Sequence, residues 1–137
     1  MKGKKQQVVI VKKDYKTVKI ETDFPCLGAS RDNGKVWKVT SLLQHVKEQE
    51  LEPFDLPLCG ISIGIAVWGE APMDVLNFTR HWKRAMETDL KYPVILDETG
   101  WIMDGWHRVA KALYLGHSTI KAVRFDKTPD CDYIVAE

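Results

Sequence analysis

The residues with the clearest chemical potential lie in one short segment, residues 102–108 (IMDGWHR). Its pattern predicts a strand that runs directly into a helix across Asp104 and Gly105. The unpaired N–H groups of a helix's first turn favour an anion, and a cationic pair there opposes the helix dipole unless an anion offsets it. His107 and Arg108 therefore indicate a phosphate site. Arg108 is expected to make the strongest side-chain contact, and His107 a weaker one that protonates near its ordinary pKa of about 6.5.

Each of these residues also has a purely structural interpretation. Asp104 can be the N-cap of the helix instead of a catalytic or metal-binding carboxylate, and Gly105 can simply permit a tight turn. Trp106 can pack in the core instead of stacking on a base or closing the site. A phosphate site predicts that Arg108→Ala weakens binding by roughly ten- to hundredfold and leaves the fold intact. The structural interpretation predicts lower thermal stability and no binding of phosphate compounds.

A second group of cationic residues lies at residues 80–84 (RHWKR). Arg80 and Arg84 are four residues apart and share one face of a helix, with His81 beside Arg84. This face is either solvated surface or a border of the same site, where it would add cations to the bound phosphate. Asp97 is expected to be a turn residue, with a Mg²⁺ ligand as the alternative.

The surrounding elements predict a small α+β domain with a mixed sheet. Gly100 can supply the positive φ of a hairpin turn at residues 97–100. The expected strands are a β-ribbon over 1–22, a strand at 61–68, the hairpin strands 94–96 and 101–103, and a closing strand at 119–125. The expected helices cover 36–50, 72–90 and 104–115. The acidic end, 126–137, is expected to fray.

The helix that begins at Pro72 carries an apolar stripe at helical spacing, which indicates the side that faces the core. The stripe consists of Val75, Leu76, Phe78, Trp82, Ala85, Met86 and Leu90.

Composition limits the class of protein. The chain has 137 residues, which suits one domain, and its net charge of +1 excludes a uniformly basic nucleic-acid coat. Cys26, Cys59 and Cys131 are odd in number and widely spaced, so neither a disulfide framework nor a zinc site is expected, and the thiols are predicted to be unbonded and not catalytic. No apolar run is long enough for a membrane span or a signal peptide, so a soluble cytoplasmic protein is expected.

The charge is unevenly distributed along the chain. The first 20 residues contain seven lysines and one acidic residue. Lysines at 2–19 are expected to protect the edges of the ribbon. The alternative is contact with nucleic acid or an acidic partner.

Residues 54–125 resemble the ParB/sulfiredoxin superfamily. The matching segments are DLPL at 55–58, YPVILD at 92–97, IMDGWHRVAKA at 102–112, LG at 115–116 and IKAV at 120–123. The resemblance implies a core over 54–125, an N-terminal extension over 1–53, and a nucleotide at the strand–helix junction with its phosphates on His107 and Arg108. It also implies ATP or CTP with Mg²⁺, for which Asp97 and Asp104 are the candidate ligands.

The chain differs from some members of the superfamily, and these differences limit which members it resembles. Trp106 stands where sulfiredoxins carry their reactive cysteine, so that nucleophile is missing. The chain is too short for the DNA-binding domain of partitioning ParB proteins. Residues 104–108 (DGWHR) are most similar to the Asp-Gly-His-His-Arg motif of ParB-like free serine kinases. By position, the catalytic glutamate of those kinases would fall at Glu70.

Three classes of function remain open. One is a nucleotide-binding enzyme, a phosphotransferase or nucleotide hydrolase, with Asp104, Asp97 or Glu70 as its carboxylate. Another is a non-enzymatic module whose contacts change when it binds a nucleotide or phosphorylated ligand. The third is a nucleic-acid-binding or nuclease ParB-like protein, against which the near-neutral charge counts.

Overall fold

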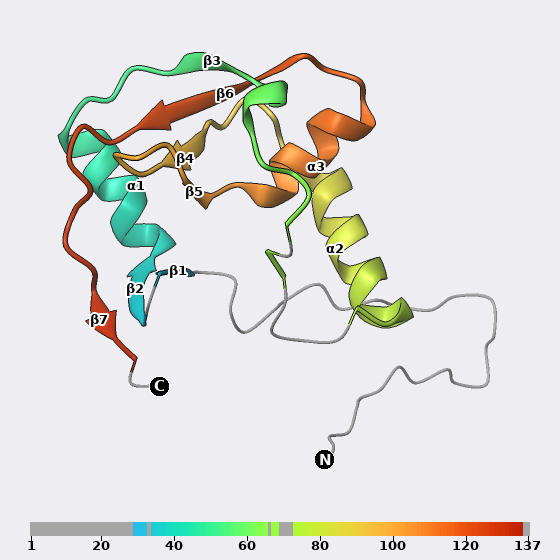
Figure 1. The fold of residues 1–137 in the computed structure, drawn as a ribbon, viewed down its shortest axis with the longest axis horizontal. Helices are drawn as coiled ribbons and strands as arrows, with labels where there is room; N and C mark the ends of the chain where they lie inside the picture. Colours follow the sequence, from blue (N-terminus) through green and yellow to red (C-terminus); the bar gives the residue numbers. More distant parts are fainter. Residues whose placement is uncertain (1–28, 33, 66, 69–72, 136–137) are drawn as a thin grey trace.

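A computed structural model of the chain describes residues 29–32, 34–65, 67–68 and 73–135 (Figure 1). These residues form a mixed α+β structure, which confirms the predicted α+β class, while the predicted ribbon over 1–22 lies outside them. The helices are α1 (Val39–Glu48), the 3-10 helix η1 (Leu58–Gly60), α2 (Val75–Glu87) and α3 (Trp106–Tyr114). The strands are β1 (Ala29–Asp32), β2 (Lys35–Lys38), β3 (Phe54–Pro57), β4 (Val94–Leu96), β5 (Ile102–Asp104), β6 (Thr119–Arg124) and β7 (Tyr133–Ile134).

The larger sheet has four strands in the order β3-β6-β4-β5. Strands β4 and β6 are parallel, whereas β3 with β6 and β4 with β5 are antiparallel, so the sheet is mixed as predicted. The β4–β5 hairpin is also confirmed: Asp97 donates its N–H to the Trp101 carbonyl at 2.8 Å, and Gly100 adopts a φ of 93° in the turn.

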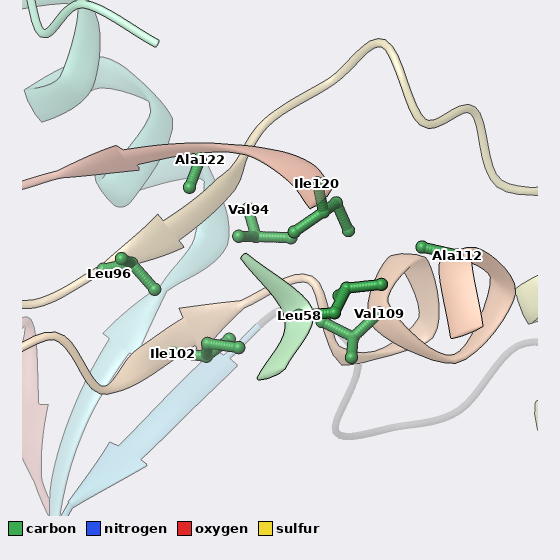
Figure 2. Close-up of a cluster of buried hydrophobic side chains, with 8 residues drawn as sticks. All are labelled: Leu58, Val94, Leu96, Ile102, Val109, Ala112, Ile120 and Ala122. Carbon is green, nitrogen blue, oxygen red and sulfur yellow. The ribbon is translucent and has the colours of Figure 1, made fainter. Parts of the chain in front are cut away.

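Buried side chains lie on both faces of this sheet because neighbouring residues of a strand point to opposite sides. On one face, Val94 and Leu96 of β4 pack with Val109 and Ala112 of α3; Figure 2 shows the full cluster of Leu58, Val94, Leu96, Ile102, Val109, Ala112, Ile120 and Ala122. On the other face, Ile95 packs with Leu42 of α1 and with Phe125. The contacts with β4 therefore fix the position of α3, which begins just after β5 in the chain.

The smaller sheet joins the two ends of the described chain in the order β1-β2-β7. Its last strand corrects the expectation that the chain frays after residue 125, because Tyr133 pairs with Val36; residues 136 and 137 lie outside the described residues. Just before this strand, the Asp132 carboxylate accepts the Lys38 N–H at 2.7 Å and the Ser41 hydroxyl at 2.9 Å. The bond from the Lys38 N–H is the main cause that lowers the pKa of Asp132.

One predicted strand is wrong, and one predicted helix is present but starts later than the first residue of its apolar pattern. The described part of residues 61–68 forms no strand, and Ile63 and Ile65 are exposed. The edge of β6 is instead taken by β3, which the two prolines Pro53 and Pro57 obscured in the sequence. The first predicted helix begins at Val39 because the residues before it form β2.

Helix α2 corrects the prediction that its apolar stripe faces the core. It begins after Asp74, whose carboxylate accepts the Asn77 N–H at 2.8 Å, and it ends at Glu87 rather than Leu90. Only Ala85 is buried, whereas Phe78 and Trp82 are exposed. The reason is that α2 packs against the single helix α3 beside the sheet, which covers a narrower strip than a sheet face would (Figure 1).

Candidate functional site

The junction of β5 and α3 is confirmed where the sequence predicts it. Gly105 has a φ of 119°, and a Cβ atom there would lie 2.5 Å from Cγ1 of Val94, so only glycine fits. Gly105 is also the N-cap residue of α3, which corrects the interpretation of Asp104 as the cap. The helix therefore begins with no side-chain cap and no acidic residue in its first turn, an arrangement that favours an anion.

Arg108 lies at this junction, but its guanidinium contacts oxygens of the protein itself. Its Nη1 donates to the carbonyls of Pro93 at 2.8 Å and Tyr92 at 3.2 Å, and its Nη2 donates to the Asp104 carboxylate at 3.1 Å. Both side chains of the Arg108–Asp104 ion pair are largely buried. This geometry favours the structural interpretation of Arg108, because its guanidinium is bonded to oxygens of the protein. Its charge is still close enough to lower the pKa of His107.

A pair of histidines joins α2 to α3. Nδ1 of His81 and Nε2 of His107 are 2.8 Å apart, a hydrogen bond in which the donor depends on the tautomers. Trp68 stacks on both rings, with centroid distances of 4.6 Å to His81 and 4.7 Å to His107. We call Trp68, His81, Arg84 and His107 the histidine cluster.

The electrostatics of the histidine cluster disfavour positive charge on its imidazoles. Burial is the main cause that lowers the pKa of His107 to about 4, followed by the charges of His81, Arg84 and Arg108. Burial and then Arg84 also lower the pKa of His81. The sequence-based expectation that His107 protonates near its ordinary pKa is therefore wrong for the protein alone.

The members of the second cationic group, at residues 80–84, have different neighbours in the structure. His81 and Arg84 border α3, because Arg84 is close enough to lower the pKa of His107. These two residues therefore lie close to His107, while their role in holding a phosphate stays a prediction. Arg80 donates to Oδ1 of Asn77 on its own helix at 3.4 Å.

The candidate Mg²⁺ ligands do not converge. Oδ1 of Asp97 accepts bonds from the Thr99 N–H, the Thr99 hydroxyl and the Trp101 N–H, so Asp97 is a turn residue. Asp104 pairs with Arg108, and Glu70 lies outside the described residues. Within the described ranges no three His, Cys, Asp or Glu side chains form a group that could hold a metal ion.

Trp68 is the site residue that sequence reasoning missed. It stands at the end of the segment predicted as a strand, and nothing in its spacing links it to residues 81 and 107. Trp106 takes the packing role foreseen as an alternative: it is partly buried against the core and meets Trp101 edge-to-face with ring centroids 6.1 Å apart.

Two of the three cysteines lie within the described residues. Cys59 and Cys131 are unbonded, while Cys26 lies outside the described residues. Among the described residues, the helices are too short or too polar to cross a membrane.

Comparisons with protein-family models, curated proteins and solved structures gave no match. The protein is therefore a mixed α+β structure in which the histidine cluster, with its neighbouring arginines, lies between α2 and α3. The resemblance to the ParB/sulfiredoxin superfamily rests on the sequence segments alone.

Proposed function

We propose that this protein binds a nucleotide or another phosphorylated small molecule at the junction of α2 and α3. The observation that carries the proposal is the histidine pair, His81 and His107, held 2.8 Å apart beside the charges of Arg84 and Arg108. The first turn of α3, which contains His107, has no side-chain cap, and the backbone N–H groups of such a turn favour an anion. The imidazoles and the backbone N–H groups would donate hydrogen bonds to an anion, and the two arginines would attract it by their charge.

A phosphate group would reverse the electrostatics of the cluster. Its negative charge offsets Arg84 and Arg108, so the pKa of His107 should rise from about 4 toward or above the ordinary value. At neutral pH, binding should therefore take up a proton. Trp68, stacked on both imidazoles, would fix the plane of the rings and exclude water from one side.

Among the described residues, the geometry favours binding over phosphoryl transfer. A phosphotransferase or nucleotide hydrolase needs a carboxylate that is free to take a proton or hold a metal. The carboxylate of Asp104 is engaged by Arg108 at 3.1 Å, and Asp97 is engaged by its own turn. We therefore propose a binding module, with its partner contacts set by the ligand.

Titration calorimetry with ATP, CTP, GTP and inorganic phosphate, each with and without Mg²⁺, tests the proposal. At least one compound should bind, with a heat that depends on the protonation enthalpy of the buffer. Arg84→Met and His107→Gln should weaken binding by roughly tenfold or more, because each removes a charged or hydrogen-bonding partner.

Lys83→Met is the matched control, since Lys83 lies on the same helix but pairs with Glu87 at 2.9 Å. It should leave the affinity unchanged. Absence of binding by every compound at millimolar concentration, or equal weakening in Lys83→Met, would contradict the proposal.

A further inference from the structure

We propose a second binding site, for a small cationic molecule, in a hollow between the β4–β5 turn and the segment at 128–131. The hollow has a volume of about 500 Å³, which is within the range of roughly 300–1,000 Å³ typical of small-molecule sites. Its walls come from β1, β2, the hairpin and the C-terminal segment. It shares no lining residue with the histidine cluster, so it stands independently of the phosphate proposal.

The hollow is strongly acidic for its size. Asp32, Asp97, Glu98 and Asp130 line it against one cation, Lys35, which gives four negative charges, one positive charge and a formal sum of −3. Within the described ranges, none of these four carboxylates forms an ion pair within 4.0 Å. Like charges that line one concave surface focus the field in it and raise the local concentration of cations.

An aromatic surface accompanies these carboxylates. The ring of Trp101 is about half exposed, with a relative accessibility of 48% for the residue, whereas Trp37 and Met103 lie buried beneath the hollow. A half-exposed indole beside carboxylates attracts an ammonium or guanidinium group and also packs against methylene groups. An aliphatic stem with one or more cationic ends combines both features. We therefore assign the hollow to a polyamine-like or guanidinium-bearing small molecule.

The walls of the hollow are fixed before any ligand binds. Glu98 donates its N–H to the Thr128 hydroxyl at 2.9 Å, and Thr128 returns its N–H to the Glu98 carboxylate at 2.8 Å. The indole N–H of Trp37 donates to the Pro129 carbonyl at 2.8 Å. These bonds across distant parts of the chain hold the turn and the C-terminal segment together, so a ligand needs to order little of the protein.

The test is a calorimetric titration of the full chain with spermidine and with agmatine, and with glutarate as the anionic counterpart. Each cation should bind saturably and more weakly as salt is raised, and glutarate should not bind. Trp101→Leu should weaken binding by about three- to tenfold through the lost cation–π contact. Asp130→Asn should weaken it by about two- to fivefold, as expected for one exposed charge.

Asp126→Asn is the control, because Asp126 is exposed and near in sequence but does not line the hollow. Melting curves of all variants show whether the fold is kept. No saturable binding of either cation, equal weakening by Asp126→Asn and Asp130→Asn, or full binding by Trp101→Leu would overturn the proposal. Saturable binding of a lysine-rich peptide without binding of either small cation would also overturn it, in favour of a protein partner.

Discussion

The histidine cluster and the acidic hollow have opposite electrostatic character within one small domain. At the cluster, burial and then the charges of His81, Arg84 and Arg108 lower the pKa of His107, whereas at the hollow four carboxylates face one lysine. The two regions approach each other through Trp106, in the first turn of α3, and Trp101. The net charge of +1 therefore describes neither region, because the surroundings of the cluster are cationic and those of the hollow are acidic.

The largest expected effect comes from breaking the junction on which the cluster depends. Gly105→Ala combines a φ of 119° with a Cβ atom that would lie 2.5 Å from Val94. It should lower the free energy of unfolding by about 2–5 kcal/mol, the sum of left-handed strain and overpacking. Urea unfolding measures this.

Gly116→Ala is the control for that prediction. Gly116 also has a positive φ, of 77°, but an added Cβ atom would meet no atom within 4 Å. The cost should be only about 1–2 kcal/mol. Equal losses in the two variants would show that the contact with Val94 is not what restricts position 105.

Arg108→Ala separates structural from ligand-binding roles at the cluster. The loss of the bonds to Tyr92, Pro93 and Asp104 should lower the free energy of unfolding by about 1.5–3 kcal/mol. Lys91→Ala, which removes an exposed contact of 3.9 Å to Asp89 and a cation–π contact of 5.2 Å with the Tyr92 ring, should change it by about 1 kcal/mol or less. An Arg108→Ala protein as stable as the parent would restore the interpretation of Arg108 as a phosphate-binding residue.

The low pKa of His107 predicts how stability depends on pH. Because its pKa is about 4 in the folded protein and about 6.5 when unfolded, the unfolded state binds more protons between these values. Stability is therefore retained above about pH 6.5 and falls as the pH drops toward 4. Partial solvation reduces the expected loss to about 1–2 kcal/mol.

His107→Gln should flatten this dependence, and unfolding curves at several pH values measure it. His45→Gln is the control, since His45 lies at the exposed end of α1. An unchanged slope in His107→Gln would place the titrating group elsewhere.

The smallest predicted effect concerns the contact between the two regions. A double-mutant cycle of Trp101→Leu and Trp106→Leu should give a coupling of about 0.5–1.5 kcal/mol, the range for an edge-to-face aromatic pair. A coupling near zero would mean that the rings contribute independently and that the two regions are not joined through them.

The sequence predicts the parts of this protein that depend on local rules. The hairpin turn at Gly100 and the strand-to-helix junction at Gly105 follow from glycine conformation and from the spacing of apolar residues. The β6 strand is likewise found within one residue of its predicted limits.

Contacts between distant segments are what the sequence does not predict. Helix α2 would have the same amphipathic pattern whether it packed against a sheet or against a single helix. Periodicity therefore does not show that Phe78 and Trp82 stay exposed. The pairing of β7 with β2 and the stacking of Trp68 on His81 and His107 likewise depend on tertiary placement. The partners of Arg108, two carbonyls and a carboxylate, are not visible in the spacing of residues 102–108.

The central claim, that the histidine cluster is an anion site, is tested most directly by the pKa of the His107 imidazole, measured by NMR. For the protein alone the account predicts a pKa of about 4. At saturating concentrations of the nucleotide or phosphate compound that binds in calorimetry, it predicts a rise of the pKa of His107 to about 6.5 or above. A pKa of His107 that stays the same with every phosphate compound would contradict the account.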